Sequence, residues 1–379
     1  MGQARELYWQ LFNIAANKRS LAMNIQLQDV DWKSMRHARG HAGDIPQLLS
    51  DLTADDLDKQ KTAALTLRAV LESQNVSYEP GFYAIPVLIN VLDDEACMSK
   101  ELVLDILLAI LNGRTWKELF VVNEEIRSGR VDPEIYKVDL LRMGLDTYKR
   151  LTKSSEFEVR LRSVDLIVAT APPTDEHIRF LITSFETEPD EALKAITVGL
   201  IGYVLAKRDR DDIDEYMQFL RRESTNSSYK ISIRAFGAII VAEKHRPDIG
   251  TLAGLLERID GSKSALADDD WVLINIINRV GDLLSPFDVV ILMQLSQYAK
   301  TRHALVMVFN PLLNKLFLEV DPRSKLIVPV AKEDLTFYQR WLLQTILANN
   351  GFWEEELNED QLIYFALPTT REALIELIT

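Results

Sequence analysis

The sequence predicts an all-α protein, an α-α superhelix in which antiparallel helix pairs stack one on another. Residues 44–52 and 84–92 share Ile, Pro and Leu at matching places forty residues apart, with apolar residues at i, i+3, i+4 and i+7. Farther along, Ile178, Ile213 and Ile249 recur at intervals of 35 and 36 residues. Few alternating apolar–polar stretches bounded by turn residues, the pattern of β-strands, are present. A period near 35–40 residues with helical spacing is typical of stacked helix pairs.

Helix punctuation recurs every fifteen to twenty residues and gives the expected elements in order. Asp132-Pro133 places a capping side chain before a proline in the first turn, and residues 155–158 read as a capping box. In the first half we expect helices at 3–17, 31–38, 44–52, 55–74, 80–93, 98–113, 115–128, 133–153 and 156–170. In the second half they follow at 174–186, 190–207, 211–223, 228–245, 247–258, 268–283, 286–300, 303–318, 333–349 and 358–378.

The domain organisation follows from where the repeat pattern holds. Residues 31–318 carry the pattern, whereas 1–30 and 319–379 carry no clear copy of it. Terminal repeats of a solenoid are atypical because one of their faces meets water. We therefore expect one solenoid over residues 1–379 with two caps, and a separate helical unit at 319–379 is the alternative.

Composition narrows the class of protein. The 379 residues are 47% hydrophobic and 26% charged, with a formal net charge of −14, which disfavours nucleic acid and anionic membranes as partners and fits a basic protein. Cys97 is the single cysteine, so no intramolecular disulfide can form. No secretory signal and no apolar run long enough to span a bilayer is found, so a cytoplasmic location is expected, with no cofactor.

The densest local motif lies at residues 37–46. His37 and His41, followed by Asp44, have the residue types of a metal site. Gly40 and Gly43 argue against one helix that holds both imidazoles on one face. The structural interpretation is that His37 ends a short helix, the glycines turn the chain and Asp44 caps the next helix.

The same residues carry a family resemblance. The order His37-Ala38-x-Gly40-x-Ala42-x-Asp44-Ile45-Pro46, then Val76-Ser77-Tyr78 and Ile85-Pro86-x-Leu88-Ile89, resembles the opening of bacterial HEAT-repeat proteins over residues 30–95. The resemblance implies an armadillo-like solenoid. Some members resemble immunity proteins encoded beside bacterial toxins, which implies a protein-binding role. Arg39 and Asn75 depart from the pattern, where an aromatic residue and a glycine are common.

Two sets of charged residues are candidate partner-binding sites. The basic set, near the starts of successive second helices, is Arg160, Lys194, Lys230 and Arg234. Its cations either line one groove or pair with neighbouring acids between repeats. The acidic set lies at expected helix starts and comprises Asp211, Asp212, Asp269 and Asp270 with the adjacent Trp271. Those carboxylates either complement helix dipoles or steer a basic partner.

Motifs for chemistry are not found. The chain has no Gly-x-Gly-x-x-Gly or Walker loop, no Gly-x-Ser-x-Gly elbow and no His-Glu-x-x-His helix. We therefore expect a non-catalytic protein-binding scaffold or adaptor that uses its concave surface or an acidic loop edge, for example an immunity-type protein against a basic partner. The alternatives are a ligand handler resembling phycobilin lyases and a helical-repeat DNA glycosylase, and the net charge disfavours the glycosylase.

Overall fold

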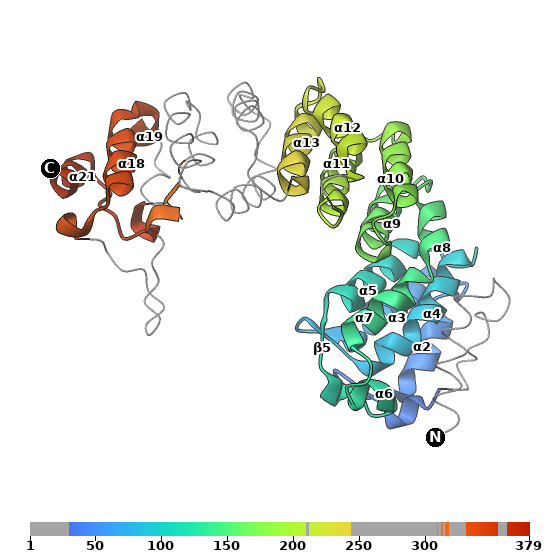
Figure 1. Cartoon of the computed structure of the whole chain (residues 1–379). Helices are drawn as coiled ribbons and strands as arrows, with labels where there is room; N and C mark the ends of the chain where they lie inside the picture. Colours follow the sequence, from blue (N-terminus) through green and yellow to red (C-terminus); the bar gives the residue numbers. More distant parts are fainter. Residues whose placement is uncertain are drawn as a thin grey trace. The chain divides into compact units, whose positions relative to one another are not determined.

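The computed structural model describes residues 30–209, 212–243, 309, 312–313, 315–317, 331–354 and 362–379. The chain forms two compact units, Met1–His177 and Ile178–Thr379 (Figure 1). Helices dominate both units, and the predicted fold class, all-α with stacked helix pairs of the α-α superhelix kind, is confirmed. The helix expected at 3–17 and those expected between 247 and 300 lie outside the described residues.

The described part of the first unit is built from helix pairs. The first pair is α2 (Ile45–Asp51) with α3 (Leu57–Leu71), and the second is α4 (Glu79–Asp93) with α5 (Lys100–Asn112). A third pair joins α7 (Pro133–Arg142) and α8 (Leu145–Leu151) to α9 (Phe157–Thr170). The second helices α3, α5 and α9 pack side by side, and we call them the second-helix layer (Figure 1).

The two segments that revealed the repeat do not start their helices at the same place. Pro46 lies in the first turn of α2, whereas Pro86 lies inside α4, which begins two residues after Ser77. Pro80 in the first turn of α4 supplies the fixed φ that favours a helix start. The sequence match at Ile-Pro therefore marks the buried face of both helices, since Ile45 and Ile85 are fully buried, but not their beginnings.

Short strands replace helix where the sequence analysis expected it. Residues 31–38 form a 3₁₀ turn at Trp32–Ser34 and then β1 (Arg36–His37), which pairs with β2 (Gly40–His41). β3 (Glu72–Ser73) pairs with β4 (Val76–Ser77), and β4 pairs in parallel with β5 (Arg114–Thr115). Two-residue strands carry too little alternation for the pattern to be detected.

Residues 113–132, a segment without a counterpart in the other repeats that the structure describes, separate α5 from α7, and we call this segment the insert. It contains β5, a 3₁₀ turn at Lys117–Leu119 and α6 (Glu124–Arg127). The helix predicted at 115–128 is therefore wrong for most of its length. The Glu79 carboxylate at the start of α4 holds the insert in place, because it accepts hydrogen bonds from the backbone N–H groups of residues 121–123 at 2.6–3.0 Å.

Of the two helix caps predicted from the sequence, the one before α7 is present and the one before α9 is not. Asp132 caps α7 as predicted, accepting from the N–H groups of the next residues, with Pro133 in the first turn. The capping box predicted at residues 155–158 is wrong, since no side chain caps α9 at Glu156. A capping box occurs instead at Thr336 and Gln339, at the start of α18.

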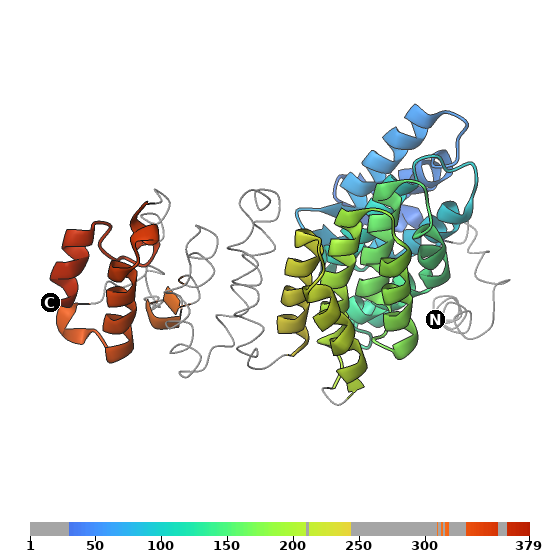
Figure 2. The ribbon, with the colours of Figure 1, turned by 90° about the horizontal axis from the view of Figure 1, so that it is seen from above.

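In the second unit successive helix pairs contact one another through residues 36 positions apart. The unit contains α10 (Asp175–Thr187, which starts in the first unit), α11 (Glu191–Leu205), α12 (Asp214–Ser224) and α13 (Tyr229–Ala242), and α11, α12 and α13 pack side by side (Figure 2). Arg179 on α10 pairs with Glu215 on α12 at 3.7 Å, thirty-six residues on. Gly202 on α11 faces Ala238 on α13 at the same interval.

The end of the chain adds a second group of helices to this unit. α18 (Phe337–Ala348), α19 (Asn350–Glu354) and α21 (Arg371–Ile378) bury Leu343, Phe352 and Leu374 in one hydrophobic core. That core continues to Ile233 and Ile240 of α13. Residues 365–370 are not helical, so the helix expected at 358–378 is interrupted around Pro368.

Candidate functional site

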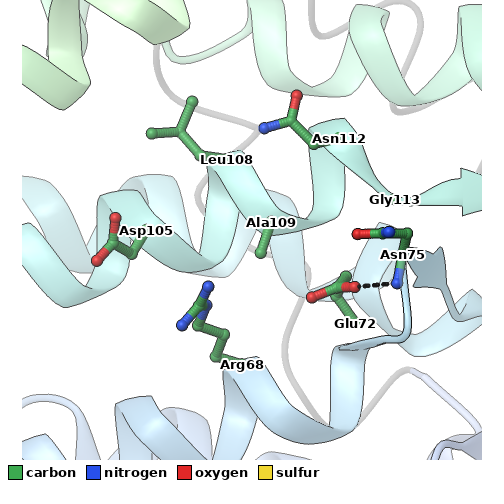
Figure 3. Close-up of a pocket in the computed structure, with 8 residues that line it drawn as sticks. All are labelled: Arg68, Glu72, Asn75, Asp105, Leu108, Ala109, Asn112 and Gly113. Atoms are coloured by element: carbon green, nitrogen blue, oxygen red, sulfur yellow. Dashed lines mark hydrogen bonds between the residues drawn. The ribbon is translucent and has the colours of Figure 1, made fainter. Parts of the chain in front are cut away.

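A polar pocket lies between the last turns of α3 and α5 in the second-helix layer of the first unit (Figure 3). Its volume is about 300 Å³. Side chains from two helices and one turn form the lining, which comprises Arg68, Glu72, Asn75, Asp105, Leu108, Ala109, Asn112 and Gly113. The α5 members are spaced i, i+3, i+4 and i+7, so one face of that helix supplies most of the wall.

The turn between β3 and β4 closes one end of the pocket. Gln74 and Asn75 have φ of 54° and 60°, the left-handed conformation that a two-residue hairpin turn requires. Asn is one of the few residues besides glycine that adopt this conformation readily. Next to it Gly113 leaves room for the strand pairing, because a Cβ there would lie 2.2 Å from the Ser77 Oγ. The N–H of Arg114 then donates to the Asn75 carbonyl at 2.6 Å.

The two carboxylates in the pocket already have partners. Glu72 Oε1 accepts a hydrogen bond from the Asn75 N–H at 2.8 Å (Figure 3). Asp105 forms an ion pair with Arg162 of α9, and Arg162 also pairs with Glu158. Asp105 is thereby paired with a cation, whereas Glu72 keeps its negative charge and accepts a backbone hydrogen bond.

Arg68 is the cation of the pocket, and it differs from the two carboxylates in its contacts. Its side chain is exposed, and its guanidinium makes no hydrogen bond or ion pair with any residue that the structure describes. Figure 3 shows it directed toward the space below Asp105 and Ala109. An uncommitted guanidinium beside engaged carboxylates makes this pocket the strongest candidate binding site in the described part of the chain.

A further carboxylate lies on α9 close to this network. Asp165 is partly buried, and its environment raises the pKa of its carboxyl group to about 6, because burial disfavours the charged form more than Arg162 favours it. No hydrogen bond to its carboxylate is made by a described residue. This group titrates near neutral pH, unlike an ordinary aspartate.

The residues of the predicted basic set have different local environments. Arg160 is buried, and its guanidinium donates to the carbonyls of Ser154 and Ser155 at 3.0 Å, so it secures the entry into α9. Lys194, on α11, lies 5.6 Å above the Phe185 ring.

The other two members lie on α13. Lys230 is partly buried in its first turn. Arg234 is also partly buried and packs its Cδ toward Gly199. Arg160 belongs to the first unit and the other three to the second, so the four residues are placed by different local environments.

Most of the predicted acidic set lies outside the described residues. Asp211, Asp269, Asp270 and Trp271 are among the residues whose placement is not described. Asp212 is exposed, and its carboxylate lies 3.9 Å from the guanidinium of Arg208, four residues earlier in the chain. Its ion pair stays within the loop that leads to α12.

The motif at residues 37–46 is structural. His37 is buried in β1, its Nδ1 accepts the Arg39 N–H at 3.0 Å, and its Nε2 therefore carries the proton that it donates to Asp44 at 3.0 Å. His41 is exposed on β2. The expected cap at Asp44 is wrong, because its carboxylate accepts from His37 rather than from the N–H groups of α2.

Glu79 and Lys137 are buried ionisable residues of types that often act in catalysis, but their charged groups are already bonded within the protein. Burial raises the pKa of Glu79, while the three N–H donors from the insert oppose that shift. Lys137 is 1% exposed, and its ammonium group donates to the Gly113 carbonyl and pairs with Glu134, both at 2.7 Å. Both side chains hold the insert against its neighbours.

The sequence analysis did not find the pocket. A signal was present on this face of α5, where Asp105, Ala109 and Asn112 are polar or small and Leu108 is the one large apolar residue of the lining. The partner of Asp105, however, is 57 residues away. Among the described residues no group of His, Cys, Asp or Glu side chains is placed to hold a metal ion, and no helix is long and apolar enough to cross a membrane.

Comparisons with known proteins add little. No protein-family model matches the chain, and no curated protein matches it. A solved structure of an engineered protein is similar at 14% identity, with 88% of this chain and 93% of that chain covered and a TM-score of 0.31.

Proposed function

We propose that this chain is a non-catalytic scaffold that binds another protein along its second-helix layer. The observation that carries the proposal is the contrast between two sets of polar groups. Buried groups with reactive chemistry, namely His37, Glu79 and Lys137, spend their hydrogen bonds inside the protein. The uncommitted cation of the pocket, Arg68, lies instead on an open layer of packed helices.

The proposed partner is a basic protein of the cytoplasm. The net charge of −14 attracts a basic surface over a distance of about one Debye length, roughly 8–10 Å. Such attraction raises the rate of association more than the final affinity. An immunity-type role, in which the scaffold holds a basic toxin, is the most specific form of the proposal and rests on the HEAT-like residues of the first half.

The experiment combines capture from the native host with mapping on the full chain. Leu65 lies on α3, one turn before the pocket, and its side chain is 56% exposed. Leu65→Arg would place a bulky cation on the second-helix layer. Ile135→Arg is the matched control, because Ile135 is 64% exposed on α7, outside that layer.

The wild type and the control are expected to retain one stoichiometric protein that is released at high salt, and Leu65→Arg is expected to lose it. Hydrogen exchange of the purified complex should protect amides of α3 and α5. Loss of the partner in both variants, or protection confined to other helices, would exclude the second-helix layer as the binding surface.

A further inference from the structure

We propose that the pocket between α3 and α5 receives a single carboxylate, the side chain of an aspartate or glutamate of a partner polypeptide, on the guanidinium of Arg68. This inference rests on the proposed protein-binding function and specifies the chemistry that the pocket recognises. It is argued from the hydrogen bonds that are already made in the pocket and from those that are left over.

Neither of the two acidic residues in the pocket lining is paired with Arg68. Glu72 is one helical turn away on α3, the spacing at which an ion pair often forms, but its Oε1 accepts the Asn75 N–H. Asp105 across the pocket pairs with Arg162. A guanidinium keeps five N–H donors in a planar fork that matches a carboxylate with two parallel hydrogen bonds.

Two amide side chains add to the donors. The side chains of Asn75 and Asn112 line the pocket, and neither makes a hydrogen bond with a residue in the described ranges. The Asn75 backbone N–H and carbonyl are both used, which fixes the turn that carries its amide. The pocket thus combines one cation with two amides, all without partners, on a rigid backbone.

The charge of the surroundings opposes a dianion more strongly than a single carboxylate, so binding depends on the hydrogen bonds that Arg68 can donate. Arg68 and Arg162 face Glu72, Asp105 and Glu158, so the local sum is slightly negative. The last turns of α3 and α5 add the partial negative charge of two helix ends. A phosphate dianion is therefore disfavoured, and a lysine or arginine of the partner would meet Arg68 directly.

This arrangement complements the attraction of a basic partner. The negative net charge attracts a basic partner in many orientations. A pocket that accepts one carboxylate of that partner would then select a single docking orientation. A volume of about 300 Å³ holds a glutamate side chain with part of its backbone.

The test uses the full chain and small probes in place of the partner. N-acetylglutamate α-amide carries one side-chain carboxylate, and N-acetylglutamine α-amide is its uncharged isostere. Arginine Nε–Hε signals are followed by NMR during titration with each probe and with inorganic phosphate, at constant ionic strength. The variants are Arg68→Gln and, as a control of equal charge change, Arg39→Gln, since Arg39 is exposed on the β1–β2 turn.

We expect the glutamate probe to shift one arginine signal saturably, and that signal to be missing in Arg68→Gln. Amide signals of residues 75 and 112 should shift with the same midpoint, and affinity should fall about tenfold or more in Arg68→Gln, because a hydrogen-bonded charge is lost. Arg39→Gln should bind as the wild type does.

Equal shifts with the glutamine probe, tighter binding of phosphate, or unchanged affinity in Arg68→Gln would overturn the proposal. The capture experiment distinguishes this failure from failure of the scaffold role. If the partner still protects α3 and α5 while the carboxylate probe does not bind, only the chemistry assigned to the pocket is wrong.

Discussion

Replacement of Asp165 by asparagine is expected to stabilise the protein at neutral pH and to leave its stability unchanged in acid. Asp165 lies on α9, partly buried, and its carboxylate has no hydrogen-bond donor among the described residues. Burial raises the pKa of this group from 3.8 to about 6. The folded protein therefore holds the Asp165 proton more tightly than the unfolded chain does.

The size of the effect follows from that difference. Each pKa unit corresponds to about 1.4 kcal/mol, so the pKa change for Asp165 sets an upper bound of about 3 kcal/mol. Partial exposure screens the charge, and we expect a gain of about 1–2 kcal/mol for Asp165→Asn at pH 7.5. Well below the unfolded-state pKa of 3.8 the carboxyl group is protonated in both states and resembles the amide, so the gain should fall to nearly zero as the pH approaches 3. Between pH 4 and 6 the wild type loses stability as the pH rises.

The assay is urea unfolding of the wild type and of Asp165→Asn at several pH values from 3.5 to 8. Asp139→Asn serves as the control, because Asp139 is exposed on α7 and pairs with Arg142 at 2.7 Å. The control should show no gain at neutral pH. A gain for Asp165→Asn that is equal at pH 3.5 and 7.5, or a loss at pH 7.5, would refute the argument, since neither can arise from a buried charge without donors.

Three further substitutions test other parts of the packing by thermal or urea unfolding. Glu79→Gln should cost about 1–3 kcal/mol, because the N–H groups of residues 121–123 lose a charged acceptor, and hydrogen exchange should then quicken in the insert first. Tyr148→Phe should stabilise the protein by about 1 kcal/mol, because the fully buried Tyr148 hydroxyl has no partner among the described residues. A loss of stability would contradict this, since it would mean that the hydroxyl makes a hydrogen bond. Gly202→Ala should cost about 1–3 kcal/mol, because the new Cβ would lie 2.4 Å from the Ala238 Cα; a neutral result would mean that α11 and α13 separate easily.

How well each helix or strand was predicted depended on the number of residues over which its apolar pattern repeats. α4, α5 and α9 were predicted within two residues at each end, because their apolar faces repeat over three or more turns. The long helix expected at 133–153 divides into α7 and α8 at residues 143–144. The glycine at 144 packs under the ring of Tyr148, a close approach that only the fold reveals. The hairpins were missed because two-residue strands have no pattern to read.

The sequence by itself determined the helical class and the period, since apolar spacing and caps are local properties of a helix. The 36-residue interval is visible both in the repeated sequence and in the pair Arg179–Glu215. Only the tertiary structure decided which charges remain uncommitted. Asp105 and Arg162 are 57 residues apart, an interval lengthened by the insert, so no repeat pattern could pair them. Because that pair occupies the carboxylate that α5 contributes to the pocket, Asp105 does not pair with Arg68, which has no partner among the described residues.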